Sequence, residues 1–175
     1  MPPCSPCSTR RPHPTPNQPR RPFVKVGEFA TTGVITADSS HTVAQAAKLM
    51  RDHHVGDLVL HEPGDRTTQP IGIVTDRDLV VGVIGLGLDP SVFTLGDILQ
   101  TPLHTAVVDE DVDVVISRMR VLGIRRVPVV DTHGHLTGIF TMDDYLRYLG
   151  RQLQSLTDLV QNERTREQDS RVVIT

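Results

Sequence analysis

The chain carries one pattern twice, and this internal repeat constrains its fold more than any other feature. The pattern begins with Val26-Gly27-Glu28-Phe29, which returns 69 positions later as Leu95-Gly96-Asp97-Ile98. It ends with Gly72–Asp78, which returns 66 positions later as Gly138–Asp144. The three-residue difference falls in the polar stretch 62–69, where a surface hairpin tolerates a change in length. Two copies that cannot each bury their own apolar face predict one globule with an approximate twofold axis and two equivalent clefts at the join.

The repeat divides the chain into four parts. We expect a disordered tail, a first repeat, a second repeat and a C-terminal helix with a frayed tail, over residues 1–25, 26–94, 95–150 and 151–175. The first part is rich in proline and has five basic residues but no acidic one, so it cannot bury enough apolar surface to fold. It contains Cys4 and Cys7, and the local sequence supplies no further ligand for a zinc site and no βαβ unit for a redox pair.

The composition excludes several classes of protein. Aromatic residues make up only 3% and Trp is absent, so Val, Ile, Leu and Met must build the core. A formal net charge of −3 gives no general attraction to nucleic acid or to an anionic membrane. The longest apolar run, Leu79–Leu88, contains three glycines and is about half as long as a bilayer span. Since the repeats contain no cysteine, a reducing cytoplasm is the expected compartment.

Local signals in each repeat predict the order βαββα and an α/β fold with mixed sheets. In the first repeat Thr42 caps a helix over 43–53, with one apolar face formed by Val43, Ala46, Ala47 and Met50. The equivalent helix begins near Asp111 and ends at Gly123, a residue suited to a left-handed cap. Two short strands follow each helix, over residues 58–60 and 71–74 in the first repeat and 127–130 and 136–140 in the second. A further helix then starts at Asp76 and at Met142.

Two signature motifs in register identify a resemblance. Both Gly72–Asp78 and Gly138–Asp144 read Gly-Ile-x-Thr-x-x-Asp, and the strand at 126–131 reads Arg-Val-Pro-Val-Val-Asp. With the element order, these residues resemble cystathionine-β-synthase (CBS) domains over 26–150, and the tandem resembles a Bateman module of the stand-alone bacterial type. The resemblance implies a disc-shaped regulatory module without a required cofactor. Its ligand would be AMP, ADP or ATP, with S-adenosylmethionine possible, and an effector protein would read its occupancy.

The resemblance also implies two composite clefts, each with residues from both repeats. Cleft A comprises Thr75, Asp78, His104, Thr105, Ala106 and Arg126. Cleft B, which we expect to bind more weakly, comprises Thr141, Asp144, Ile35, Thr36, Ala37 and Asp57. The chemistry suits this role, because the carboxylate of Asp78 or Asp144 can accept two hydrogen bonds from a ribose diol. The alternative is structural, since Thr followed three residues later by Asp is also an ordinary helix start.

The two clefts differ in charge. Arg126 offers a planar donor fork to a phosphate, whereas its counterpart Asp57 would repel one. We therefore expect a phosphate-bearing nucleotide in cleft A, and either no ligand or a less anionic adenosine compound in cleft B.

Catalytic and metal sites find no support in the sequence. No nucleophile elbow, Walker phosphate loop or zinc motif is present, so we assign no catalytic residue and expect no enzyme. His53 and His54 adjoin on a helix and point about 100° apart, which does not suit joint chelation, so we expect no metal ligands. The rival to a ligand sensor is a dimeric scaffold that keeps the fold but has lost its ligand.

The C-terminal helix carries an apolar stripe. Its members recur at steps of three and four residues: Leu146, Leu149, Leu153, Leu156 and Val160. Such a stripe either packs back on the module's own surface or meets a second subunit or a target protein. We expect a homodimer, and we expect the chain after Glu163 to fray.

Overall fold

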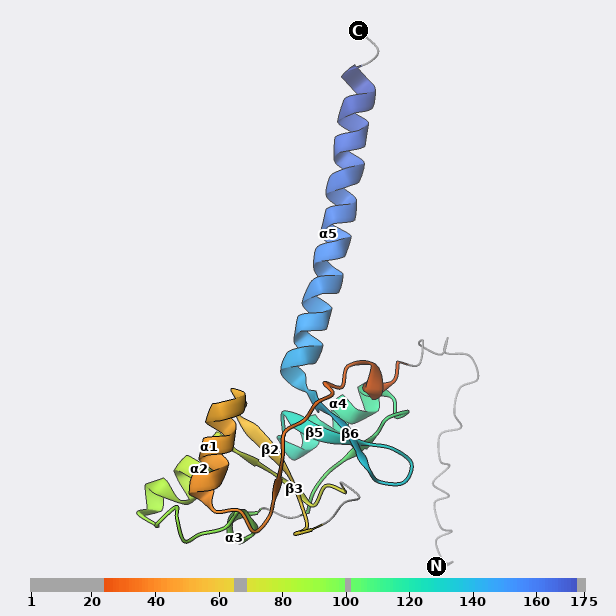
Figure 1. Cartoon of the computed structure of the whole chain (residues 1–175). Coiled ribbons are helices and arrows are strands. Elements are labelled where there is room, and N and C mark those ends of the chain that lie inside the picture. Colours follow the sequence, from red (N-terminus) through yellow and green to blue (C-terminus); the bar gives the residue numbers. More distant parts are fainter. Residues whose placement is uncertain (1–23, 65–68, 100–101, 173–175) are drawn as a thin grey trace, which may run out of the picture.

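The computed structural model describes residues 24–64, 69–99 and 102–172. Most of the expected tail at 1–25, including Cys4 and Cys7, and part of the hairpin insertion lie outside the described residues. The described chain forms two three-stranded sheets with helices packed on them, and one long helix that projects away from the body (Figure 1).

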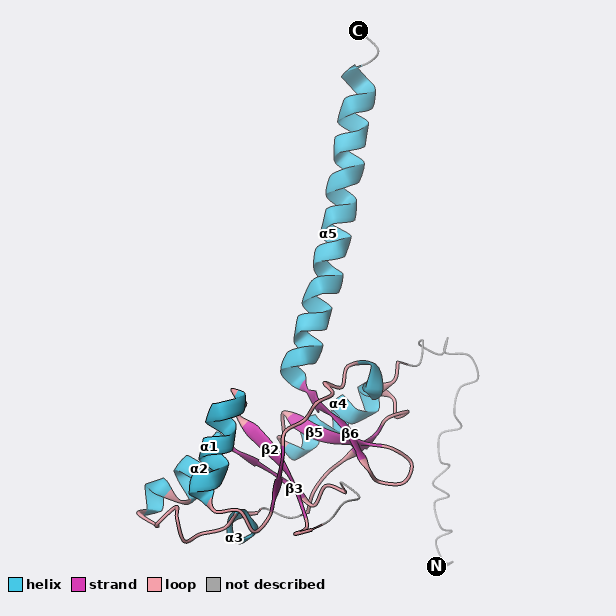
Figure 2. Cartoon of the chain, in the orientation of Figure 1, coloured by secondary structure: helices cyan, strands magenta, loops and turns pink. Residues whose placement is uncertain are grey.

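The first repeat has the expected βαββα order (Figure 2). Its elements are β1 (Thr36–Asp38), α1 (Val43–His53), β2 (Asp57–His61), β3 (Gly72–Thr75) and α2 (Asp76–Gly82). Strand β2 lies in the middle of the sheet, parallel to β1 and antiparallel to β3. A short 3-10 helix, η2 (Ile84–Leu86), follows α2.

The second repeat has the same order and the same pairing. Its elements are β4 (Ala106–Val107), α4 (Val112–Leu122), β5 (Arg126–Val130), β6 (Leu136–Thr141) and α5 (Met142–Val172). Strand β5 pairs in parallel with β4 and antiparallel with β6. The expected α/β fold with two symmetry-related repeats and mixed sheets is therefore confirmed.

The helix ends follow from local hydrogen bonds. At the start of α1, Thr42 Oγ1 accepts from Gln45 N at 3.3 Å, and Gln45 Oε1 accepts from Thr42 N at 2.8 Å. These reciprocal bonds satisfy two N–H groups that the first turn leaves free. Gly123 closes α4 in the left-handed region at φ 68°, and His54 closes α1 in the same conformation at φ 55°.

The core has two parts, one for each sheet. The inner face of α1 buries Val43, Ala46 and Met50 against the first sheet, as the spacing predicts. The prediction for Ala47 is wrong, because this residue is exposed at the edge of the stripe and Leu49 packs inward instead. Phe140 is fully buried at the centre of the second core.

The two repeats exchange their lead segments, which are residues 24–31 with η1 (Val26–Glu28) and residues 93–99 with α3 (Leu95–Ile98). The first segment bonds to the second repeat, where Val26 N donates to the carbonyl oxygen of Glu110 at 2.9 Å. The second segment bonds to the first repeat, where Leu95 N donates to the carbonyl oxygen of His41 at 2.8 Å. Because Val26 and Leu95 are fully buried in these foreign cores, neither repeat completes its own core.

Helix α5 projects far beyond the second repeat (Figure 1). Its apolar stripe is uncovered. The five predicted stripe residues are between 38% and 66% exposed. The alternative in which the stripe packs back on the module is therefore wrong. The helix continues past Glu163 to Val172, and residues 173–175 lie outside the described range. Among the described residues, none of the helices combines the length and the hydrophobicity that a membrane span requires.

Candidate functional site

A cavity of about 660 Å³ lies between the two repeats. One wall is the junction of β3 and α2, and another is the junction of α4 and β5. Ile98 and residues 102–104 supply further lining. The lining residues are Ile73, Val74, Thr75, Asp76, Arg77, Asp78, Ile98, Pro102, Leu103, His104, Leu122, Gly123, Ile124, Arg125 and Arg126.

This cavity brings together four of the six residues predicted for cleft A. Thr75 and Asp78 from the first repeat line it together with His104 and Arg126 from the second. Thr105 is absent from the lining, although its carbonyl oxygen accepts from the Arg118 guanidinium at 2.8 Å. The side chain of Ala106 is buried in the second core and also stays out of the cavity.

Asp78 performs a structural role with one of its oxygens. Asp78 Oδ2 accepts from Thr75 N at 2.8 Å and from Thr75 Oγ1 at 2.7 Å, and Asp78 N donates back to Thr75 Oγ1 at 3.2 Å. This capping box starts α2 directly after β3 ends. The other oxygen, Oδ1, makes none of the hydrogen bonds found within the described residues. The capping role and a ligand-binding role are thus compatible.

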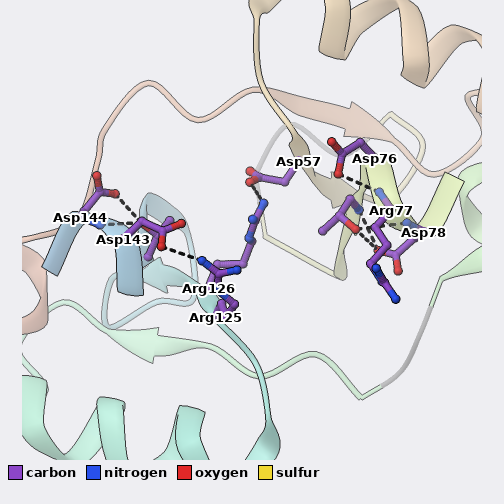
Figure 3. Close-up of polar contacts among 10 residues, drawn as sticks. Asp57, Asp76, Arg77, Asp78, Arg125, Arg126, Asp143 and Asp144 are labelled. Atoms are coloured by element: carbon purple, nitrogen blue, oxygen red, sulfur yellow. Dashed lines mark hydrogen bonds and ion pairs between the residues drawn. The ribbon is translucent and has the colours of Figure 1, made fainter. Parts of the chain in front are cut away.

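Arg126 and Asp57 form an ion pair with each other across the join of the repeats. Arg126 is the first residue of β5, Asp57 is the first residue of β2, and Arg126 Nη1 donates to Asp57 Oδ2. Figure 3 shows the two side chains pointing toward one another. Arg126 is thus engaged by Asp57 in the structure, while the expected phosphate preferences of the two clefts stay predictions. Equivalent positions of two repeats meet wherever they lie beside the twofold axis, and here their opposite charges attract.

The residues predicted for cleft B are more fully engaged than their counterparts. Asp144 Oδ2 accepts from Thr141 Oγ1 at 2.6 Å and from Thr31 Oγ1 at 3.4 Å. Asp144 Oδ1 accepts from Arg147 Nη1 at 2.8 Å, so both carboxylate oxygens have partners. The residue equivalent to Arg147 in the first repeat is Val81, which cannot make such a bond. Of the other members, Ala37 is buried in the first core, while Ile35 and Thr36 are half-buried.

Sequence reasoning missed two arginines of the cavity wall. Arg77 stands between Asp76 and Asp78 in the signature and forms no ion pair with any residue that the structure describes. Arg125 also lines the cavity, with its Nη2 2.7 Å from Asp143 Oδ1 (Figure 3). The two x positions of the Thr-x-x-Asp motif could have indicated this difference, because Arg77 in the first motif corresponds to Asp143 in the second.

The site has the donors and acceptors of a polar small-molecule site rather than those of a metal centre. Across 24–64, 69–99 and 102–172, no three His, Cys, Asp or Glu side chains gather where they could hold a metal ion. The cavity instead combines two carboxylates, a threonine and three guanidinium groups with apolar side chains. This mixture suits a ligand that has both a hydrophobic ring and charged or hydroxyl groups.

Comparisons with known proteins agree with this architecture. The sequence model of the CBS domain family matches residues 26–85 and 95–151. An uncharacterised protein of Methanopyrus kandleri, MK0525, is 40% identical over 124 residues, which cover 71% of this chain but only 62% of that protein. The solved CBS domain pair of protein MJ0100, in complex with 5′-methylthioadenosine and S-adenosyl-L-methionine, has a TM-score of 0.63 and 30% identity over 75% of this chain and 99% of that one.

A second solved structure is the hexameric CBS-CP12 protein from bloom-forming cyanobacteria. It has a TM-score of 0.62 and 32% identity, over 70% of this chain and 69% of that one. Since both repeats match the family and the fold agrees with its solved members, this chain belongs to the CBS domain family as a tandem pair.

Proposed function

We propose that the protein is a regulatory module that binds an adenosine compound in cleft A and passes its occupancy to a partner protein, without catalysing a reaction itself. The observation that carries the proposal is the cavity of about 660 Å³ lined jointly by Asp78 and Arg77. In support, a similar CBS pair was solved with two adenosine compounds. The cysteine-free repeats favour the cytoplasm as its compartment.

The side chains suggest how such a ligand lies. The free oxygen of Asp78 is the acceptor for the ribose hydroxyls, and the Thr75 hydroxyl is beside it. Arg77 supplies a cation for a phosphate, which favours AMP, ADP or ATP over uncharged adenosine. S-adenosylmethionine is the alternative, because Asp76 at the same wall can face its sulfonium.

Cleft B is empty or takes a less anionic compound in this proposal. Asp144 already accepts three hydrogen bonds, including one from Arg147. Asp143 stands where cleft A has Arg77, so the local charge at this position is reversed. Both differences disfavour a phosphate at the second signature.

We also propose that two copies associate through the exposed stripe of α5. A helix that exposes five large apolar residues on one face is a common mark of a protein interface. A similar CBS protein is a hexamer, which supports oligomerisation as such.

Thermal unfolding with a panel of adenosine compounds tests the proposed function. AMP, ADP, ATP, adenosine and S-adenosylmethionine are compared on the wild type, Asp78→Asn and Asp144→Asn. A ligand at about 100 times its Kd stabilises the wild type by about 2.7 kcal/mol, which raises the Tm by several degrees. We expect Asp78→Asn to lose most of this rise and Asp144→Asn to keep it.

Two outcomes would reject parts of this proposal. A rise that is undiminished in Asp78→Asn rejects the assignment of cleft A. If no compound of the panel shifts the wild type, the ligand-free scaffold is the better account. Because each variant is compared with itself without ligand, a change in its intrinsic stability does not affect the reading.

A further inference from the structure

We propose that the Asp57–Arg126 ion pair is a switch that an anionic ligand in cleft A must open, and that this switch couples the two clefts. The inference rests on the proposed function, because it concerns the same cavity. Arg126 lines the cavity, yet its guanidinium is bound to Asp57 from the other repeat. The pair is only partly exposed, with 29% of the Arg126 side chain and 21% of the Asp57 side chain accessible.

The pair is attached to both signature motifs through the sheets. Asp57 lies directly across from Thr75 in the antiparallel pairing of β2 and β3. Arg126 lies directly across from Thr141 in the pairing of β5 and β6. One bond therefore joins the strand beside the cleft A threonine to the strand beside the cleft B threonine. A change in this bond acts on the walls of both clefts.

A phosphate in cleft A and the Asp57 carboxylate compete for the same guanidinium. Asp57 is mostly shielded from water, so removing its partner leaves a poorly solvated charge and opposes the exchange. Uncharged adenosine does not need Arg126 and leaves the bond intact. Once released, Asp57, which is one of the residues predicted for cleft B, leaves an unpaired negative charge at the join of the two repeats. Occupation of cleft A by an anion thus disfavours a second anion in cleft B.

Calorimetric titration of AMP and adenosine into Asp57→Asn tests the switch. Asparagine keeps the size of the side chain but removes its charge, so Arg126 becomes available to the phosphate. We expect the affinity for AMP to rise about tenfold and the affinity for adenosine to change less than twofold. Arg126→Gln cuts the same pair from the other side, and it should weaken AMP binding without affecting adenosine.

Asp109→Asn is the matched control. Asp109 also forms an ion pair, with its Oδ1 2.6 Å from Lys25 Nζ, but it does not line the cavity. Its substitution changes the net charge of the protein by the same amount as Asp57→Asn. It should leave both affinities within twofold of the wild type.

The outcomes separate the switch from the proposed function. If the wild type binds AMP and Asp57→Asn binds it no more tightly, the switch is wrong and the binding site stands. A gain for adenosine as large as the gain for AMP also overturns the switch. If Asp57→Asn binds AMP and the wild type does not, the result supports a switch that the ion pair holds closed. If neither protein binds AMP or adenosine, the proposed function fails and the switch fails with it.

Discussion

Arg77 and Asp143 occupy the same position in the two signature motifs and have opposite charges. In cleft A this gives a cation at the cavity wall that pairs with no residue the structure describes. In cleft B the equivalent carboxylate is bound to Arg125. The phosphate preference proposed for cleft A therefore depends on Arg77 as well as on Arg126.

Arg77→Gln should lower the affinity for AMP about tenfold, because a charge-assisted hydrogen bond to phosphate is lost. The affinity for adenosine should stay within twofold, since adenosine has no phosphate. Titration calorimetry measures both. Arg120→Gln removes an exposed arginine of α4 that does not line the cavity and should change neither affinity. An equal loss for both ligands would contradict this role for Arg77.

Single residues were predictable from the sequence where local patterns place them. Thr75 and Asp78 come where an apolar strand ends and a capped helix starts, so the junction of the two elements fixes their position. The contact of Thr31 with Asp144 joins residues 113 positions apart and leaves no local signal. The pairing of Asp57 with Arg126 was equally unpredictable from the sequence. An alignment of the two repeats does not show which equivalent residues lie beside the approximate twofold axis.

At the scale of elements, the glycine of the second signature motif is explained by the lead segment that crosses it. A Cβ on Gly138 in β6 would lie 2.9 Å from the carbonyl oxygen of Thr31. Thr31 and Ile139 also exchange two backbone hydrogen bonds, of 2.9 and 3.0 Å. The first lead segment is thereby held against β6, and only a residue without a side chain allows this approach.

Gly138→Ala should lower the free energy of unfolding by about 1–3 kcal/mol, because the lead segment must move away from β6. Gly150→Ala is the control, since a Cβ placed there in α5 has no atom within 4 Å apart from its chain neighbours and the nearby backbone of the helix itself. That change should be neutral or stabilise the helix by about 0.5–1 kcal/mol. Urea unfolding of both variants gives the comparison, and equal stability of the two would contradict the steric argument.

Helices and strands were largely predictable, whereas their partners across the repeats were not. The apolar spacing and the Thr42 cap predict α1 to the residue, since both signals are local. The exchange of lead segments depends instead on which core receives Val26 and which receives Leu95. Either core would accept an aliphatic side chain, so composition alone does not decide between them.

At the scale of the whole molecule, α5 is the element that the fold itself does not explain. Its stripe recurs at alternating steps of three and four residues from Leu146 to Val160, the spacing of helices that pack along their length. The sequence left open whether the module or a partner covers this stripe. Whether the module covers the stripe depends on the direction in which α5 leaves β6. The periodicity of the sequence does not determine that direction.

Light scattering at micromolar concentration should give a mass of about twice the 19.3 kDa of the chain. Leu153→Glu should shift the mass toward one chain, because it places a charge in the middle of the stripe. Gln154→Glu introduces the same group beside the stripe and should leave the assembly unchanged. A monomeric wild type would overturn the proposed association, and a larger assembly would extend it.

The exchange of lead segments has a consequence for what happens when the two repeats are separated. A fragment cut between the repeats would keep a segment meant for its missing neighbour and would have a gap where that neighbour's segment belongs. Proteolysis at this point would therefore leave two fragments that each expose apolar core surface, rather than two folded domains. The loss of one repeat would leave either Val26 or Leu95 without the core that buries it, so the two repeats fold as a pair.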